Sequence, residues 1–428
     1  MAEKGEWKRG GQALTRLVHQ VAALDLGEET SFREGRLTVS AQEAAALVAS
    51  PALAEVRVSC ASPGDAVRIV KLLDAVEPRT KGPGGAGIFP GLLGPRRPVG
   101  GGDTHVLRGA VVVAAGFLPR AQEAVVDMSG PAAPLSPLGS THNVVVEFTP
   151  APGADWEQVD SALRHGLVAL AARLAEAALD SAPDSVETLP SVVDRADDGL
   201  PRVGVLTNLQ TQGQFKQPFV YGRSFTDSFS TLIDPNELDD GAVVSGQFGH
   251  PGLKNSTLVY QNHPIVEALR RRHGSDLRFA GVVISPEPVD QAGKEFMSAH
   301  AARVCALAGF DAALVTKEGG GNADADMSLA MDALEDMGIP AVGLFAEMAG
   351  RDGTGPSIVV PPARATAMVS TGNYDERLVL PAVERALGGE RVELVSLAAT
   401  EGMEVPMAAI YCSLSPLGWG HSTCREVA

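Results

Sequence analysis

Cysteine is scarce in this sequence, and a long apolar run is missing. The four cysteines among 428 residues are widely separated, and none forms a CxxC pair. This spacing indicates neither a zinc ribbon nor a redox dithiol. No uninterrupted apolar stretch approaches the length of a membrane span, and the first residues carry charges where a secretory signal would have its apolar segment. We therefore expect a cytoplasmic protein with no attachment to a membrane.

Positive charge is in deficit, and no metal-ligand pattern is present. Lys and Arg total 35 against 52 Asp and Glu, which gives a formal net charge of −17. Phosphate binding needs a clustered positive surface, so nucleic acid is not an expected partner. The nine histidines include no pair at helical ligand spacing, and we therefore predict no metal site.

The first part of the sequence contains short apolar runs separated by glycine and proline. This pattern predicts a β-rich N-terminal domain over residues 1–185. Its Gly- and Pro-rich segment, residues 81–109, includes large apolar side chains at positions 88–93, so we predict an ordered loop rather than a linker. Leucine and valine recur every three or four positions over residues 155–179. That period predicts a long helix with Asp155 as its N-cap.

An acidic, Pro-containing segment then marks a domain boundary, and the pattern changes beyond Pro201. The apolar runs RVGVLTN, GAVVSG, FAGVVIS, AALVT and AVGLFA alternate with helical stripes, two of which end at Gly309 and Gly338. Glycine is the usual C-terminal signal of a helix. Strand, helix and strand in this rhythm predict a mostly parallel sheet flanked by helices. We therefore predict an α/β protein whose C-terminal domain, residues 200–428, is doubly wound and Rossmann- or flavodoxin-like.

The chemistry of such a sheet lies beyond the carboxyl ends of its strands. AALVT runs into KEGGGNADAD and AVGLFA runs into EMAGRDG, so close backbone approach would be combined with carboxylates and an arginine. Carboxylates can hold an ammonium group or a hard cation, and an arginine can clamp a carboxylate. The candidate substrate-binding residues of these two loops are Glu318, Asn322, Asp326, Glu347, Arg351 and Asp352.

A purely structural alternative exists for the first loop. Its three glycines would turn the chain, and Asp326 would cap the helix that follows. EGGG matches neither a dinucleotide-binding nor a P-loop pattern, so nicotinamide and ATP are not indicated.

Motifs along most of the chain resemble the component B precursor of the glycine, sarcosine and betaine reductases. They include GIFPGLLG, GGDTHVLRGAVVV, FVYGRS, LVYQNHP, TKEGGGNADAD, MAGRDGTG, VSTGNYDERLVLP and PLGWG, in the order of that family. Each motif is weak alone, but together they stay in register over most of the sequence. The resemblance adds Asn373, in VSTGNYDERLVLP, to the expected substrate contacts.

The resemblance implies a specific chemistry. The family's precursor cuts itself at an Asn-Cys bond, and the new terminal cysteine becomes a pyruvoyl group that condenses with an amine substrate. A partner subunit carrying cysteine or selenocysteine then attacks the substrate carbon. The resemblance therefore also implies a complex with such a partner and an oligomeric assembly.

At the cleavage position this sequence departs from the family. The Gly-Asn-Cys stretch aligns with Gly246, Gln247 and Phe248. Self-cleavage needs a side-chain nucleophile after the scissile bond, and Phe248 has none, so we expect no pyruvoyl cofactor and an intact chain. A hard cation held by the acidic loops is left open as a replacement for that organic cofactor. Ser256, which follows Asn255, is a second position where cleavage is chemically conceivable.

Two hypotheses remain for an intact chain. In the first, it is a divergent enzyme subunit that binds a small amine or carboxylate for cleavage or formation of a C–N or related bond. His250, two residues after Phe248, would then be a candidate acid or base; an ordinary loop histidine is the alternative. In the second, the chain is a catalytically silent binding or scaffold subunit.

Overall fold

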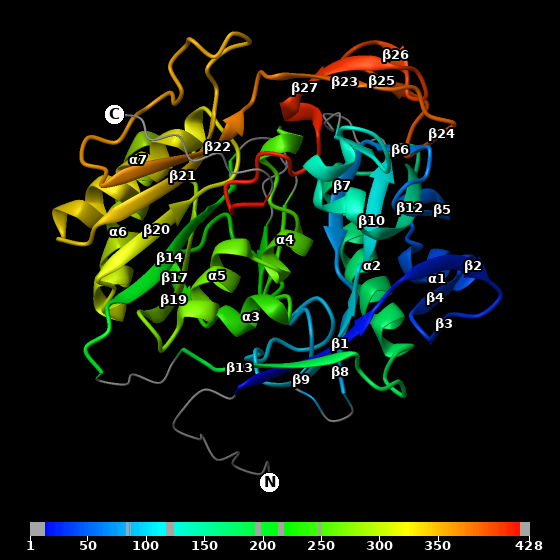
Figure 1. The fold of residues 1–428 in the computed structure, drawn as a ribbon, viewed down its shortest axis with the longest axis horizontal. Helices are drawn as coiled ribbons and strands as arrows, with labels where there is room; N and C mark the ends of the chain where they lie inside the picture. Colours follow the sequence, from blue (N-terminus) through cyan, green and yellow to red (C-terminus); the bar gives the residue numbers. More distant parts are fainter. Residues whose placement is uncertain are drawn as a thin grey trace.

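The computed structural model describes residues 13–82, 85, 87–116, 124–192, 198–212, 218–246 and 250–419. Within them the predicted α/β class is confirmed. A half rich in strands lies beside a half in which helices flank a six-stranded sheet (Figure 1). No helix in these ranges is both long enough and apolar enough to cross a membrane.

The six-stranded sheet contains four of the five predicted strands. The prediction is wrong for GAVVSG, whose strand β18 (Val243–Val244) pairs antiparallel with β15 (Phe219–Val220) in a separate small sheet. Its spatial order is β17-β19-β14-β20-β21-β22. All neighbours pair in parallel except β17, which runs antiparallel to β19 at one edge. The bounds are β14 (Arg202–Leu209), β17 (Thr231–Ile233), β19 (Arg278–Pro286), β20 (Ala312–Thr316), β21 (Ala341–Glu347) and β22 (Ala367–Asn373). Taken in chain order, the parallel strands are arranged 2-1-3-4-5, the flavodoxin-like order.

Both faces of this sheet are covered, which is why its strands are apolar throughout. Leu206 and Val283 pack into the cluster that includes α6 (Gln291–Ala308) and α7 (Asn322–Asp336). Val205 and Val282, their neighbours along the strands, point into the opposite cluster. That second cluster includes α4 (Thr257–Gln261), α5 (Pro264–Arg272) and side chains of the strand-rich half.

The strand-rich half has several small sheets around one long helix. α2 (Trp156–Glu176) begins after Asp155, whose side chain accepts from the Glu157 backbone N–H, so the predicted helix and its N-cap are confirmed. The helix packs on the sheet β5-β12-β10-β7. The strands of that sheet are β5 (Leu53–Ala61), β12 (His142–Pro150), β10 (Ala110–Gly116) and β7 (Leu72–Val76).

The other strands and helices of this half form its periphery. A second sheet has the order β13-β1-β9-β8, a third β11-β6-β24 and a fourth β2-β4-β3. α1 (Ala41–Val48) packs against α2. Apart from β24, the strands of these three sheets are β1 (Leu14–Gln20), β2 (Ala23–Gly27), β3 (Ser31–Arg33), β4 (Arg36–Ser40), β6 (Val67–Val70), β8 (Arg79–Lys81), β9 (Gly102–Arg108), β11 (Val125–Asp127) and β13 (Ser185–Leu189).

The loop predicted to be ordered is anchored in its described part. Ile88 and Phe89 are buried, and Leu92 and Leu93 pack against the same cluster as α2. Phe89 also donates its backbone N–H to Asp240 O at 2.8 Å. The loop is therefore fastened to α3 (Pro235–Asp239), which precedes Asp240 in the other half.

The last part of the chain returns to the strand-rich half. β24 (Arg385–Leu387) pairs in parallel with β6. Arg68 of β6 is fully buried and donates to both carboxylate oxygens of Asp127 and to the carbonyl oxygens of Pro381 and Ala399. The division into residues 1–185 and 200–428 stays a prediction, since this returning segment adds a strand to a sheet of the first half.

Short elements complete the chain. The remaining strands are β15 (Phe219–Val220), β16 (Arg223–Ser224), β18 (Val243–Val244), β23 (Arg377–Leu380), β25 (Arg391–Val392), β26 (Leu397–Ala398) and β27 (Met403–Pro406). The 3-10 helices are η1 (Ala133–Leu135), η2 (Pro137–Ser140), η3 (Pro251–Leu253) and η4 (Met407–Ala409).

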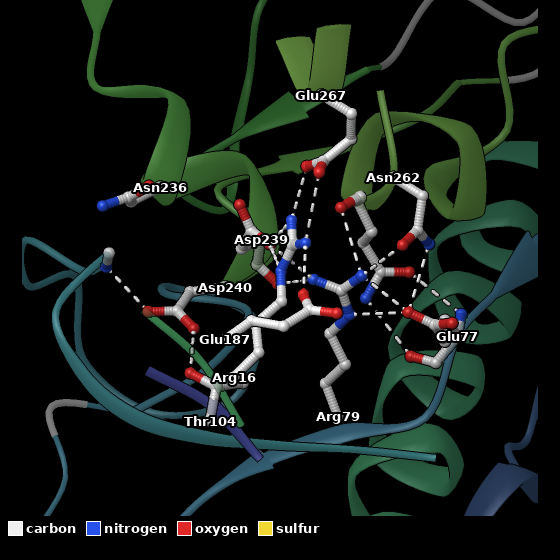
Figure 2. A network of polar contacts seen from close by, with 12 residues as sticks. Arg16, Glu77, Arg79, Thr104, Glu187, Asn236, Asp239, Asp240, Asn262 and Glu267 are labelled. Atoms are coloured by element: carbon white, nitrogen blue, oxygen red, sulfur yellow. Dashed lines mark hydrogen bonds and ion pairs between the residues drawn. The ribbon is translucent and has the colours of Figure 1, made fainter. Parts of the chain in front are cut away.

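A buried network of ion pairs joins the two halves at α3 (Figure 2). Asp239 accepts from Arg16 at 2.6 Å, from Arg270 at 2.6 Å and from Arg79 at 3.1 Å. Burial opposes ionisation of Asp239, but the three guanidinium groups outweigh it and hold its pKa well below the ordinary value. Buried charges need this degree of pairing, because an unpaired ion in the interior is very costly.

Candidate functional site

The carboxyl ends of β14, β19 and β20 meet at one edge of the six-stranded sheet. β14 lies between the other two, and the strand order reverses at this point. Ligands of open α/β sheets bind in the crevice at such a switch point. The segments that leave the three strands here carry Gln210 and Gln212, Glu287, and Lys317 and Glu318.

Glu318, a predicted site residue, is buried at this edge. Its Oε2 accepts from the backbone N–H of Gln210 at 2.8 Å. Its Oε1 meets no donor at full hydrogen-bonding geometry in the described part of the chain, although the hydroxyl of the buried Tyr260 interacts with this carboxyl group. Burial raises the pKa of Glu318 to about 7, against the opposing charge of Lys254. A carboxyl group with this pKa can exchange a proton near neutral pH.

Two further carboxyl groups share the side chain of Gln212. Its Nε2 lies 3.4 Å from Glu287 Oε2 and 3.3 Å from Asp326 Oδ2. Asp326 is also paired with the buried Lys294. Burial is the largest cause that raises the pKa of both acids: that of Asp326 to about 6, and that of Glu287 well above its usual range, where Asp326 adds its repulsion.

Asn322 belongs to the same arrangement, and the proposed cap at Asp326 is wrong. The helix α7 begins at Asn322 after Gly321, one turn earlier than expected, so Asp326 lies inside it and points to Lys294. The Asn322 side chain donates to Gln212. The structure thus brings Glu318, Asn322 and Asp326 together around the two glutamines that follow β14.

Gly319 permits the close approach of Gln210. A Cβ at this position would lie 2.4 Å from Gln210 Oε1, and the backbone φ is +66°. Both conditions favour glycine, since other residues seldom adopt a left-handed backbone. Gln210 Oε1 itself has no hydrogen-bond donor among the described residues.

A second polar layer lies behind this edge, on residues 254–257. Asn255 Nδ2 donates to Lys317 O at 3.3 Å, and Ser415 donates to Asn255 Oδ1 at 2.6 Å. Ser256 is fully buried, with Cys412 Sγ 3.8 Å from its Oγ. Burial raises the pKa of the Cys412 thiol to about 12, so this thiol is not a nucleophile at neutral pH.

His250 lies beside Tyr374, next to the predicted residue Asn373. The His250 Nδ1 and the Tyr374 hydroxyl share a hydrogen bond of 2.6 Å. Burial, followed by the charge of Lys317, lowers the pKa of His250 and thereby favours the neutral imidazole. Asn373 donates to Gly350 O at 2.9 Å and thereby shapes the loop after β21.

The other predicted residues of that loop point elsewhere. Arg351 is exposed and pairs with Glu404 at 2.8 Å. Asp352 accepts from the Thr354 hydroxyl at 2.9 Å on the surface. Glu347 is the last residue of β21 and is half-buried. Their substrate-binding roles stay predictions, and the structure does not group Arg351 or Asp352 with Glu318.

Sequence reasoning missed Gln210, Gln212, Glu287 and Lys294. A signal for Gln210 and Glu287 was present, because they lie two residues after the apolar runs RVGVLTN and FAGVVIS, just as Glu318 lies two residues after AALVT. Gln212 lies two residues further along the chain. Lys294 lies in the first turns of a helix and had no such signal. Among the described residues, no three His, Cys, Asp or Glu side chains come together as metal ligands.

Comparison with known proteins agrees with the motifs. The family model for glycine/sarcosine/betaine reductase component B subunits matches residues 13–425. The chain belongs to this family. The component B subunits alpha and beta of the glycine reductase complex of Peptoclostridium acidaminophilum are 35% identical over 416 residues, which cover 94% of this chain and 97% of the relative.

Two other relatives of this component B family come from the same organism. The sarcosine reductase complex component B subunit alpha is 34% identical over 85% of this chain and 86% of its own length. The betaine reductase complex component B subunit alpha is 31% identical over 95% and 98%. No solved structure matches. The predicted family is thus confirmed, and its relatives are components of reductase complexes.

The position at which the resemblance predicts the family's cleavage site falls outside the described residues. Gln247 and Phe248 both lie there, between Gly246 and His250. Gly246 O accepts from Lys254, so the described chain before this position is held to the second polar layer.

Proposed function

We propose that this chain is the substrate-binding subunit of a reductase-like complex and holds a small amine at the carboxyl edge of β14, β19 and β20. A partner subunit with cysteine or selenocysteine would break or form a C–N or related bond of the bound molecule. The observation that carries the amine is the unmet hydrogen bonding of Glu287 Oε1 and Gln210 Oε1, close to the carboxyl group of Glu318.

Lysine charges at this edge are already matched. Lys294 pairs with Asp326, and Lys317 lies 2.7 Å from Asp324 and donates to Gly319 O at 2.7 Å. Buried polar groups without partners cost stability, so a ligand that brings N–H donors is favoured over one that brings only acceptors. This preference selects an amine over a simple carboxylate.

The raised pKa values of the acids support a cationic ligand. Glu318 has a pKa of about 7, and that of Glu287 is higher than usual. A bound ammonium group stabilises the ionised carboxylate. Binding therefore lowers both pKa values and releases protons to the solvent.

We propose further that no pyruvoyl group forms and that the chain stays intact. Phe248 provides no oxygen or sulfur to start an acyl shift. Intact mass under denaturing conditions, followed by hydrazide labelling, tests this directly. A single unlabelled chain of 44.4 kDa is expected. Two fragments with a labelled C-terminal one would overturn it, and Ser256→Ala would then show whether cleavage occurs at Asn255-Ser256.

Calorimetric titration tests the amine site. Glycine and sarcosine, which carry N–H donors, are compared with acetate and with betaine, whose quaternary ammonium has no N–H and should bind more weakly, in two buffers of different ionisation enthalpy at pH 7. A binding amine should release protons, and Glu318→Gln and Glu287→Gln should weaken it by roughly tenfold or more, as loss of a charged hydrogen-bond partner does. Glu335→Gln is the matched control, because Glu335 binds Ala341 N at the opposite end of β21.

Three results would contradict the proposal: tighter binding of acetate than of any amine, no proton release, or equal losses in all three variants. Amine binding that persists while the partner subunit promotes no reaction would favour the silent binding subunit instead.

A further inference from the structure

Two exposed phenylalanines lie together beside the edge strand β17. Of the large apolar side chains that are exposed in the described ranges, Phe229 and Phe296 are the aromatic ones, with exposed fractions of 61% and 54%. Their ring centroids are 6.1 Å apart, and both rings contact that of His300. Phe229 lies just before β17, and the other two residues belong to α6. Exposed aromatic side chains that gather in one place indicate a protein–protein contact, since Phe is enriched in interfaces.

The outward face of α6 extends this apolar surface. The helix packs on the face of the six-stranded sheet that is remote from the strand-rich half (Figure 1). A row of exposed positions recurs along it every three or four residues, which places them on one side of the helix. They are Ala292, Phe296, Ala299, Arg303 and Leu307. Leu307 is 83% exposed. A seam with this spacing is the kind that packs one helix against another.

The exposed charges of α6 are one acid and one base. Glu295 and Arg303 are exposed, whereas Lys294 is buried against Asp326. Arg303 forms none of the ion pairs found among the described residues. The whole chain carries a formal charge of −17, so two copies repel each other in most orientations. They do not repel at a face whose exposed charges sum to zero.

We propose that α6 is the contact between two copies of this chain, which meet antiparallel about a twofold axis between Ala299 and His300. Residues equally far from the axis then stand opposite one another. Phe296 meets Arg303 of the second copy, and Glu295 lies one residue away from that arginine. A guanidinium is attracted both by the face of an aromatic ring and by a carboxylate. The face is thus complementary in charge to itself, which selects a second copy as the occupant.

Side-chain size is matched at the two ends of the same contact. Ala292 stands opposite Leu307 of the second copy, so a large exposed side chain meets a small one, as a knob meets a hole. Every such pair occurs twice in a twofold contact. Phe229 widens the contact beside the helix. The proposal does not depend on the amine site, because the residues that α6 contributes there lie on its buried face.

Sedimentation velocity of the full-length protein over a range of concentrations measures the association. A dimer is expected, and Phe296→Asp should raise its dissociation constant by at least about tenfold, as loss of a central aromatic contact does. Leu394→Asp is the matched control, because Leu394 is 53% exposed but lies far along the chain, between β25 and β26. A monomer at all concentrations, or a dimer that Phe296→Asp weakens no more than the control does, would overturn the proposal.

Charge reversal tests the facing of the two helices. Arg303→Glu brings like charges together across the contact and should weaken the dimer by at least about tenfold. Adding Glu295→Arg restores opposite charges, so the double variant should associate more tightly than Arg303→Glu alone. Both positions are exposed, and circular dichroism checks that the variants keep their fold. A double variant that associates no better than Arg303→Glu would contradict the antiparallel contact.

A single cysteine locates the axis. In Ala299→Cys the two introduced thiols lie beside the axis, whereas in Ala292→Cys they are roughly 20 Å apart along the helices. A disulfide needs Cα atoms within about 7 Å. Mild oxidation should therefore link Ala299→Cys into covalent dimers above the level of the unaltered protein, and should not link Ala292→Cys. Equal linkage of both variants, or none in Ala299→Cys, would refute the proposed contact.

Discussion

Thr257 donates two hydrogen bonds to the carboxylate of Asp74. The backbone N–H reaches Oδ1 at 3.0 Å and the hydroxyl reaches Oδ2 at 2.6 Å. Both residues are buried and come from different halves of the chain. Thr257 is the first residue of α4 and follows Ser256, so this pair fixes the start of α4 and the polar layer behind Glu318.

The substitution Thr257→Val keeps the shape of the side chain but removes the hydroxyl. We expect it to lower the free energy of unfolding by about 1–3 kcal/mol, because the buried Asp74 loses a donor. Urea unfolding followed by circular dichroism measures the change. Thr354→Val is the control, since its hydroxyl bonds to Asp352 on the surface, and it should stay within about 0.5 kcal/mol. Equal losses of unfolding free energy in the two variants would show that the buried hydrogen bond stabilises the fold no more than the exposed one.

The pH dependence of stability should report on Glu318. Its pKa is about 7 in the folded chain against 4.5 for the free side chain. The folded state therefore holds a proton that the unfolded state has lost, and stability falls as pH rises from about 4.5 to 7, by at most about 3 kcal/mol. Glu318→Gln cannot titrate. Its free energy of unfolding relative to the unaltered protein should rise between pH 5 and pH 8; a constant difference would refute the raised pKa.

Lys294 and Asp326 should be coupled in a double-mutant cycle. Lys294→Met leaves a buried carboxyl group without its ion pair and should cost about 3–5 kcal/mol at pH 8. The double substitution Lys294→Met, Asp326→Leu removes both charges and should be more stable than Lys294→Met alone, because apolar residues of similar volume often replace a buried pair without loss. The pairing would be contradicted if the double variant lost as much free energy of unfolding as Lys294→Met and Asp326→Leu lose together.

Replacement of Arg79 by lysine should markedly lower the stability of the fold. Its guanidinium is fully buried and donates to Glu77, Asp239 and Asn262 (Figure 2). A lysine keeps the charge but cannot reproduce that planar set of donors. We expect Arg79→Lys to lower the free energy of unfolding by roughly 2–4 kcal/mol. Arg36→Lys, in an exposed pair with Asp25, is the control and should change it by less than about 1 kcal/mol.

The candidate site was predictable where a residue directly follows an apolar strand. Glu318 was found by that rule, and the same rule applied to RVGVLTN and FAGVVIS would have found Gln210 and Glu287. Arg351 and Asp352 follow a strand as well, yet their loop bends outward and Arg351 pairs with Glu404. Local sequence does not specify the direction of such a loop, because distant contacts such as Asn373 with Gly350 O decide it.

By itself the sequence determined the α/β class, the long helix after Asp155 and the family, because hydrophobic periods, a capping residue and ordered motifs are local properties of the chain. Only the tertiary structure decided that Asp74 meets Thr257 and that Lys294 meets Asp326. The raised pKa of Glu318 is likewise decided only by the tertiary structure. Burial and partners far away in sequence set these properties, since desolvation depends on everything that packs around a charged group and not on its neighbours along the chain.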